Sequence, residues 1–506
     1  MSAGAIPADV ARKRPLIMAT TMLASSIYSL NLTIVSISLP HMQGTFSATP
    51  DQIAWVVTAF LVGMTTMIVA TGWISRRIGR KRLFALSLAV FTFASLMCGA
   101  AQSLEAEVMW RFLQGVAGAP IIPLSQAIAV DAYPPNQHGR AISIWGFGNM
   151  IGPIVAPPIG GFLTELYGWP AVFAINLPLG VVALLATLAV VPEVPPDRQR
   201  RFDWLGFAFL AGGLIAIQLM LNRGTRLDWF ASTEIIVEAV IGTFLLYLFV
   251  VRVFTARDPL LKPDMFRDRA FVVSAVVAFS FGLLVFLQTI LLPLLLKNLR
   301  GYPIEMIGLL LAPRALGVLV GNLAVSAVLS RIENRTLVAF GFLGVSASSF
   351  LMSGWTLEVG PWDVAAAGFL QGVCGSFMFV PTATRGFDTL PRRFQEEALP
   401  FFYLTLNIGA SVGIAGTFTY WTSSVQANHA RMVEHVTLFN PLFKPGALPE
   451  LWNLANPMAI EIEIVRQASM IAYNDTFFLI ALVALAGAPV IFLMRRRRLE
   501  AAGPRA

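Results

Sequence analysis

Charged side chains inside long apolar runs are the residues of this sequence best suited to chemistry. Arg111 lies a few residues into the apolar run 107–130, and Arg314 lies within the run 304–329. A cation inside a hydrocarbon layer is costly unless it is paired, so an intramembrane arginine marks a functional site by default. For Arg111 the alternative is a side chain that reaches back to the membrane surface.

Asn31 is a neutral amide in the stretch YSLNLTIVSISLP, residues 28–40, which is otherwise mostly apolar. Asparagine does not titrate and cannot carry a proton, but it can hydrogen-bond to a substrate or to a neighbouring helix. A purely structural amide between helices is the alternative. Further amides that could line a central cavity are Gln126, Asn149, Gln288, Asn322 and Asn407.

Few carboxylates lie at membrane depth. Glu165 follows the run 140–163 directly and is our first candidate for a group that exchanges a proton together with Arg111. Glu107 and Asp363 lie near the starts of two other runs and are less favoured alternatives.

The usual patterns of enzymes and metal sites do not stand out. Both cysteines, Cys98 and Cys374, lie in apolar runs and read as small buried residues. The four histidines show no metal-ligand spacing, and no Ser/His/Asp array or phosphate-binding glycine loop is evident. We therefore expect neither an enzyme nor a protein with a metal ion or cofactor.

The elements that hold these residues must be membrane-spanning helices. The hydrophobic fraction is 56%, the charged fraction is 13% and the mean hydropathy is +0.71, whereas a soluble domain carries about 25% charged residues. Apolar runs of about 20 residues, long enough to cross the hydrocarbon as helices, recur along the chain. The sequence predicts an all-α, polytopic membrane protein with about 14 spans, at 16–39, 52–74, 83–102, 107–130, 140–163, 170–192, 203–222, 232–252, 271–295, 304–329, 336–356, 363–386, 398–424 and 475–494.

The placement of positive charge predicts the orientation. If both termini are cytoplasmic, the inside segments hold 27 of the 36 Lys and Arg residues, as the positive-inside rule expects. The net charge of +8 then follows from topology, and no nucleic-acid partner is needed to explain it. The first run lacks a cleavage site and is too long for a signal peptide, so we expect it to be retained.

The chain also repeats itself. FLQGVAG at 112–118 returns as FLQGVCG at 369–375, and RIGRKRL at 77–83 returns weakly as RIENRTL at 331–337. The repeat predicts two six-helix bundles, 1–196 and 263–506, with an inserted helix pair at 197–262. Two such bundles that meet at a central cavity are typical of secondary transporters. We expect the cavity to be lined by Asn31, Gln126, Asn149, Gln288, Arg314 and Asn407.

Three motifs carry a resemblance to a known family. GWISRRIGRKR (72–82), RFLQGVAGAP (111–120) and GNMIGPIVAPPIGG (148–161) resemble motifs A, B and C of the major facilitator superfamily. With NLPLG (176–180) and LNRGTRLDWF (221–230), the chain is similar to the fourteen-span drug:proton antiporters of the EmrB/QacA type, especially EmrB-like pumps of tripartite systems.

The resemblance implies roles for particular residues. In motif A it implies a gate on the cytoplasmic side, with a mere topology anchor as the alternative. This gate comprises Gly72, Arg76, Gly79, Arg80 and Asp131. In motif C it implies a packing and hinge device formed by Gly148, Gly152, Pro153, Pro157, Gly160 and Gly161. In motif B it implicates Arg111 in proton transfer.

The family usually reads L-D-x-T where this chain reads Leu30-Asn31-Leu32-Thr33. The missing acid means either that the proton site has moved, with Glu165 the first candidate, or that coupling is lost.

The resemblance also implies the function. It implies a secondary active efflux transporter in the inner membrane of a bacterium that exports amphipathic drugs by alternating access with proton coupling. A dedicated exporter of a lipid, siderophore or metabolite is the alternative, and a non-transporting sensor or scaffold is a distant one. Its partners would be small amphipathic substrates, membrane lipid, and a periplasmic membrane-fusion adaptor with an outer-membrane channel. The long outside stretch 425–473 would contact the adaptor, with a mobile loop as the alternative.

Overall fold

Helices form the whole of the secondary structure in the described part of the chain. The computed structural model describes residues 8–48, 50–53, 55–134, 137–193, 202–329, 331–387, 390–436 and 457–493. The main helices are α1 (Ala8–Thr45), α2 (Pro50–Ile53), α3 (Trp55–Ile78), α4 (Arg80–Gly99), α5 (Leu104–Gly118), α6 (Ile121–Asp131), α7 (His138–Tyr167), α8 (Ala171–Ala174), α9 (Asn176–Val190), α10 (Trp204–Arg223), α11 (Thr233–Thr255), α12 (Arg269–Asn298), α13 (Ile304–Val328), α14 (Asn334–Ser353), α15 (Pro361–Arg385), α16 (Arg392–Val433) and α17 (Pro457–Gly487). Short 3-10 segments are η2 (Trp229–Ala231), η3 (Pro263–Arg267) and η6 (Ala488–Leu493).

The predicted class, an all-α polytopic membrane protein, is confirmed. Within the described residues 12 helices are long and apolar enough to cross a membrane, or 13 if the bent helix α7 counts as one span. The remaining predicted span lies in α12, a helix of 30 residues, of which the segment Arg269–Val285 is the longest part with continuously described side chains. The predicted count of 14 is therefore not confirmed.

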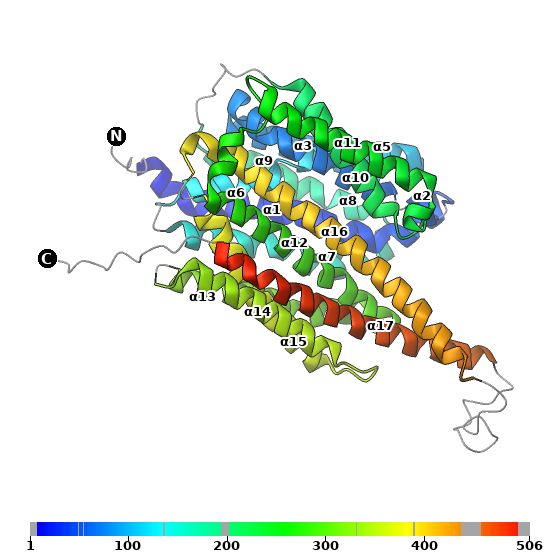
Figure 1. Ribbon diagram of the computed structural model, residues 1–506. Helices are drawn as coiled ribbons and strands as arrows, with labels where there is room; N and C mark the ends of the chain where they lie inside the picture. The colour runs from blue at the N-terminus through cyan, green and yellow to red at the C-terminus, as the bar shows by residue number, and fades with distance from the viewer. Residues whose placement is uncertain are drawn as a thin grey trace.

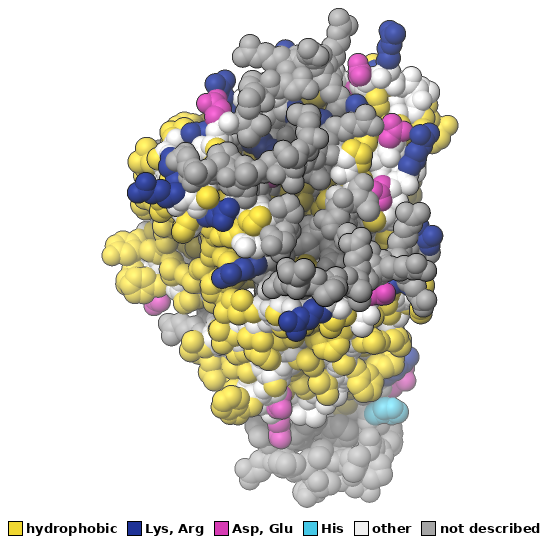
Figure 2. Space-filling view, turned by 90° about the vertical axis from the view of Figure 1, so that its left-hand side faces the viewer, with side chains coloured by type: hydrophobic (Ala, Val, Ile, Leu, Met, Phe, Trp, Pro, Cys, Tyr) yellow, Lys and Arg dark blue, Asp and Glu magenta, His cyan; other side chains and the backbone are white. Residues whose placement is uncertain are grey.

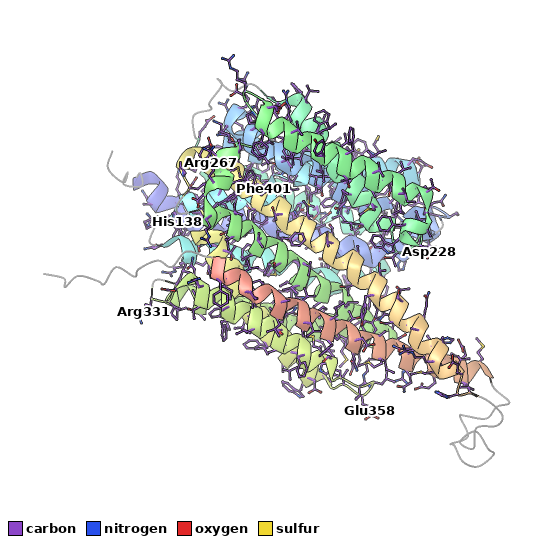
Figure 3. All side chains as sticks on the ribbon, viewed as in Figure 1. His138, Asp228, Arg267, Arg331, Glu358 and Phe401 are labelled. Atoms are coloured by element: carbon purple, nitrogen blue, oxygen red, sulfur yellow. The ribbon has the colours of Figure 1, made fainter. Side chains whose placement is uncertain are left out.

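The helices run side by side between two ends of the molecule (Figure 1). The first helix α1 begins at the same end at which η6 finishes, and we call this end the termini side and the opposite end the far side. Figure 2 looks onto the termini side and shows many Lys and Arg side chains there. In Figure 3, His138, Arg267 and Arg331 lie toward the termini side, and Asp228 and Glu358 lie toward the far side.

Helix packing in the first part of the chain recurs in the last part. The pairs α1–α7, α3–α5 and α4–α9 have counterparts in α12–α16, α13–α15 and α14–α17. Two further pairs, α7–α13 and α3–α16, join the two parts and are counterparts of each other. We call α1–α9 the first half and α12–α17 the second half. The domain limits 1–196, 197–262 and 263–506 stay a prediction.

Glycine sets the close approach of one helix pair in each half. A Cβ at Gly115 of α5 would collide with the carbonyl oxygen of Phe60 in α3. A Cβ at Gly372 of α15 would collide in the same way with the carbonyl oxygen of Arg314 in α13. Both glycines belong to the repeated FLQG sequence. The repeated glycines therefore allow the backbones of the two helices in each pair to come into contact.

The predicted outside stretch 425–473 is helical at both of its ends, and its place outside the membrane stays a prediction. Helix α16 continues to Val433 and α17 already begins at Pro457, and residues 437–456 lie outside the described part. Hydropathy falls at these positions because polar residues replace apolar ones, but the helices continue. Side-chain pairs support them, including His429 Nε2 with Glu461 Oε1 at 2.8 Å between α16 and α17.

Candidate functional site

Arg111 lies at the centre of a buried polar cluster between α1, α3 and α5. Its side chain is 1% exposed. Its Nη1 donates to Asn31 Oδ1 at 2.7 Å and to Gln114 Oε1 at 2.5 Å, and its Nε donates to the Val56 carbonyl oxygen at 3.1 Å. The guanidinium carbon lies 4.5 Å from the ring centre of Phe60. The alternative of an arginine that reaches the membrane surface is wrong, because these contacts hold the cation inside the protein.

Helix α5 presents the cluster because its polar residues share one face. Ser103 caps the helix, with its Oγ accepting a hydrogen bond from the backbone nitrogen of Ala106 at 3.2 Å. Glu107, Arg111 and Gln114 follow at intervals of four and three residues and are all buried. Side chains at these intervals stack on the same side of a helix. The inner face of α5 is thus polar near its far-side start.

Glu107 is the carboxyl group of this cluster. It is 0% exposed, and neither carboxyl oxygen has a hydrogen-bond partner among the described residues. The guanidinium of Arg111 acts on it electrostatically, and the thiol of Cys98 in α4, a weak hydrogen-bond donor, lies close to it. The sequence indicated Glu107 only as an alternative, because its position near the start of an apolar run did not reveal its burial.

The predicted proton carrier, Glu165, lies elsewhere. It is exposed in the last turn of α7, and no described hydrogen bond or ion pair joins it to Arg111. Its role stays a prediction. Asn31, in contrast, is 0% exposed and faces Arg111, which matches the structural alternative for this amide more closely than a place on a cavity wall.

A second candidate site joins the two halves on the termini side. Arg76, at the end of α3, forms an ion pair with Glu397 of α16, a carboxylate that is 3% exposed. The other oxygen of Glu397 accepts from the backbone nitrogen of Lys262 at 3.4 Å. Glu397 is not evident from the sequence, because 321 residues separate it from Arg76 and no local pattern marks it.

The other predicted members of the motif A gate lie around this contact. Arg80 forms an ion pair with Asp131 at the end of α6, so the predicted partners do meet. Gly72 is buried within α3. Gly79 joins α3 to α4 with φ of 97°, a conformation in which a side chain would be strained. The loop is therefore built for a sharp turn with its arginines held in place.

Two further polar contacts join the halves on the same side. The Tyr403 hydroxyl of α16 donates to Gln126 Oε1 of α6, and both side chains are buried. Ser143 Oγ of α7 donates to the Asn322 carbonyl oxygen of α13 at 3.0 Å, and Asn322 Nδ2 donates back to the Ser143 carbonyl oxygen at 3.2 Å. With Arg76 and Glu397, these contacts close the halves against each other at the termini side.

The remaining predicted cavity residues are spread over both halves. Asn149 Oδ1 accepts from Ser29 Oγ at 2.5 Å within the first half. Gln288 is buried and donates to Ser349 Oγ at 2.5 Å within the second half. Arg314 donates to the Val285 carbonyl oxygen at 3.0 Å, and Asn407 is partly exposed on α16. No described hydrogen bond joins these residues to one another, and their place on a common cavity wall stays a prediction.

The chain matches known transporters along most of its length. Residues 21–414 match the Major Facilitator Superfamily. The chain belongs to this superfamily. It is 32% identical to the multidrug export protein EmrB of Escherichia coli (strain K12) over 424 residues, which cover 83% of this chain and 82% of that protein. It is 31% identical to EmrB of Haemophilus influenzae over 424 residues, which cover 83% of each chain. It is 28% identical to the fatty acid resistance protein FarB of Neisseria gonorrhoeae over 472 residues, which cover 92% of this chain and 93% of that protein.

The superfamily's motif C residues pack α7 against α1. A Cβ at Gly148 would collide with Met22, and one at Gly152 with the backbone of Ser26 and Leu30. The two parts of α7, His138–Ala156 and Pro158–Tyr167, meet at 41°. The bend follows Pro153 and is compatible with a hinge. Gly160 is buried, a Cβ at Gly161 would meet no atom within 4 Å, and the side chain of Pro157 lies outside the described part.

Membership of the superfamily implies a transport role. Within the described residues no group of three or more His, Cys, Asp or Glu side chains could hold a metal ion.

Proposed function

We propose that this protein is a secondary active exporter of amphipathic toxic compounds that works by alternating access and is coupled to protons. Its similarity to EmrB proteins along most of both chains supports the cargo class. The contacts between the two halves on the termini side are the observation that supports an alternating-access cycle. These contacts must break before a cargo can enter from the termini side. The cargo leaves on the far side while the contacts are intact.

The contacts along α7 and α16 support this rocking motion. Helix α7 meets the second half near its start, at Ser143, and meets α1 of its own half from Gly148 onward. Helix α16 likewise meets the first half at Glu397 and Tyr403, and meets α12 from Gly409 onward. Each half can therefore move as one unit while the polar contacts near the helix starts form or break.

The protein is proposed to lie in the inner membrane of a bacterium with both termini in the cytoplasm, on the basis of its charge distribution. The far-side ends of α16 and α17 then project into the periplasm. Helix α16 has 42 residues, which is about 63 Å at 1.5 Å per residue, about twice the hydrocarbon thickness. This projection is a candidate contact for an adaptor protein. A photo-crosslinker at Ile462, exposed on α17, should capture such a partner, and one at Phe244, exposed on α11, should not.

Uptake by inside-out vesicles tests the exporter. Vesicles that contain the protein should accumulate ethidium when their lumen is acidified, and vesicles without it should not. A proton ionophore should abolish the accumulation. Equal uptake with and without the protein, for ethidium and for a panel of neutral and cationic amphiphiles, would contradict the proposal.

A dedicated fatty-acid exporter is the second candidate, because the similarity to FarB covers 92% of this chain. The two candidates differ in breadth. Transport of a long-chain fatty acid alone would favour the dedicated exporter, and transport of ethidium as well would favour the broad one.

A further inference from the structure

The carboxyl group of Glu107 is buried without a partner, which sets it apart from the other buried acids. Three carboxylates in the described residues are less than 9% exposed, namely Glu107, Asp203 and Glu397. Asp203 accepts from the Gly206 backbone nitrogen at 3.0 Å and pairs with Arg252 at 3.2 Å. Glu397 pairs with Arg76. Glu107 has no described hydrogen bond to either oxygen.

An ionised carboxylate in such a place is strongly disfavoured, since burial removes its water and the nearby Cys98 thiol is only a weak hydrogen-bond donor. A protonated carboxyl group is tolerated far better. The conformation described here therefore suits a Glu107 that holds a proton. The present hydrogen-bond acceptors of Arg111 are neutral, so its guanidinium can still pair with a carboxylate one helical turn away. A glutamate four residues before an arginine is the favourable order for an ion pair along a helix.

We propose that Glu107 is the proton carrier of this exporter. The inference rests on the proposed proton coupling and names its site. Glu107 is the fourth residue of α5, so it lies only about 5 Å along the helix axis from the far-side start. Protons from the far side can reach it by a short path once the packing around α5 loosens.

The geometry also links the proton to a helix contact. When Glu107 gives its proton to water, the carboxylate becomes the strongest acceptor near Arg111 and competes with Asn31 Oδ1 for Nη1. Asn31 belongs to α1, which packs against the motif C helix α7. Loss of the proton therefore weakens the bond between α5 and α1, and its return restores it. Among the described residues, the titratable or charged side chains that act on Glu107 and Arg111 are Cys98 on α4 and Tyr28 on α1, besides these two themselves on α5.

Purified protein in proteoliposomes tests the proposal with ethidium as the probe. Glu107→Gln keeps the size of the side chain but cannot exchange a proton. It should retain downhill ethidium flux and lose accumulation driven by a pH gradient, a loss of about tenfold for one proton per cargo at a gradient of about one pH unit. Ethidium-induced proton movement, read with a pH-sensitive dye, should vanish. Glu107→Asp should recover part of the gradient-driven accumulation and part of the ethidium-induced proton movement.

The same helix offers a matched control. Glu105 is exposed two residues away, and Glu105→Gln should accumulate ethidium like the parent. Glu165→Gln tests the rival site. If Glu107→Gln accumulates ethidium like the parent, or if Glu165→Gln alone abolishes the accumulation, the proposal is wrong.

Infrared difference spectroscopy separates the two possible failures. A protonated carboxyl group without hydrogen bonds gives a carbonyl-stretch band at unusually high frequency, and this band should be present in the parent and absent from Glu107→Gln. If the parent shows the band but ignores pH gradients with every probe, the proposed coupling fails and Glu107 is only a buried acid. If the parent couples but lacks the band, the assignment to Glu107 is overturned.

Discussion

Arg111 donates a hydrogen bond from Nη1 to Asn31 Oδ1 at 2.7 Å, and neither side chain is more than 1% exposed. The amide thus occupies the place next to the buried cation where the resembling antiporters usually carry an aspartate. A neutral acceptor leaves the charge of Arg111 uncompensated by this contact. The cation is then free to respond to a change of charge at Glu107.

Removal of the Arg111 side chain should abolish transport without loss of the protein. Arg111→Ala leaves three oxygen atoms, on Asn31, Gln114 and Val56, without their donor. Each buried unpaired group costs about 1–3 kcal/mol, so the thermal stability of the detergent-solubilised protein should fall measurably. Arg111→Lys should restore transport only in part, because an ammonium group cannot reproduce the planar arrangement of donors. Ethidium uptake equal to the parent in Arg111→Ala would contradict a functional role.

Asn31→Asp should be tolerated, because its Oδ1 already accepts from Arg111 and the two side chains have nearly the same shape. The new carboxylate would form a buried ion pair with the guanidinium. Asn31→Leu should transport poorly, because it removes the acceptor. In a Glu107→Gln background, Asn31→Asp should return part of the gradient-driven ethidium accumulation. A double variant that stays uncoupled would show that an acid at position 31 cannot take over the proton.

Loss of the ion pair between Arg76 and Glu397 should open the termini side. Removal of one partner of a buried pair costs about 3–5 kcal/mol. In Arg76→Gln, a Ser143→Cys reporter, buried where α7 meets α13, should therefore react with a maleimide more than about tenfold faster. The native residues Cys98 and Cys374 are buried and should add little background.

The charge swap Arg76→Glu with Glu397→Arg should slow the labelling again, and Arg77→Gln, at an exposed neighbouring position, should leave the rate near that of the parent. Equal labelling in all variants would mean that the pair does not hold the halves together.

Gly115→Ala should destabilise the protein, because its Cβ would collide with the carbonyl oxygen of Phe60 and force α3 away from α5. Overpacking of this kind costs about 1–3 kcal/mol. Gly372→Ala should have a similar effect in the second half, where the collision is with Arg314. Gly161→Ala is the matched control, since no atom lies within 4 Å of the added carbon. The measurement is the midpoint of thermal unfolding, and an equal midpoint for Gly115→Ala and Gly161→Ala would contradict the close approach.

The sequence by itself determined the class of the protein and its superfamily. Hydropathy is a property of short segments, so runs of about 20 apolar residues predict spans without any knowledge of their partners. The FLQG repeat and the three motifs are local in the same sense, and their glycines mark backbone contacts that the structure contains. Helices α16 and α17 exceeded their predicted spans because a helix does not end where its apolar character ends.

Only the tertiary structure decided which acids are buried and which residues meet. Glu107 lies at the start of one apolar run and Glu165 just after the end of another, yet Glu107 is buried and Glu165 is exposed. Burial depends on which neighbouring helices cover each face, and this information lies far away in the chain. Glu397 makes the same point, since it meets Arg76 across 321 residues. Asn31 drew attention in the sequence as a missing acid, but its partner became clear only when α1 and α5 lay side by side.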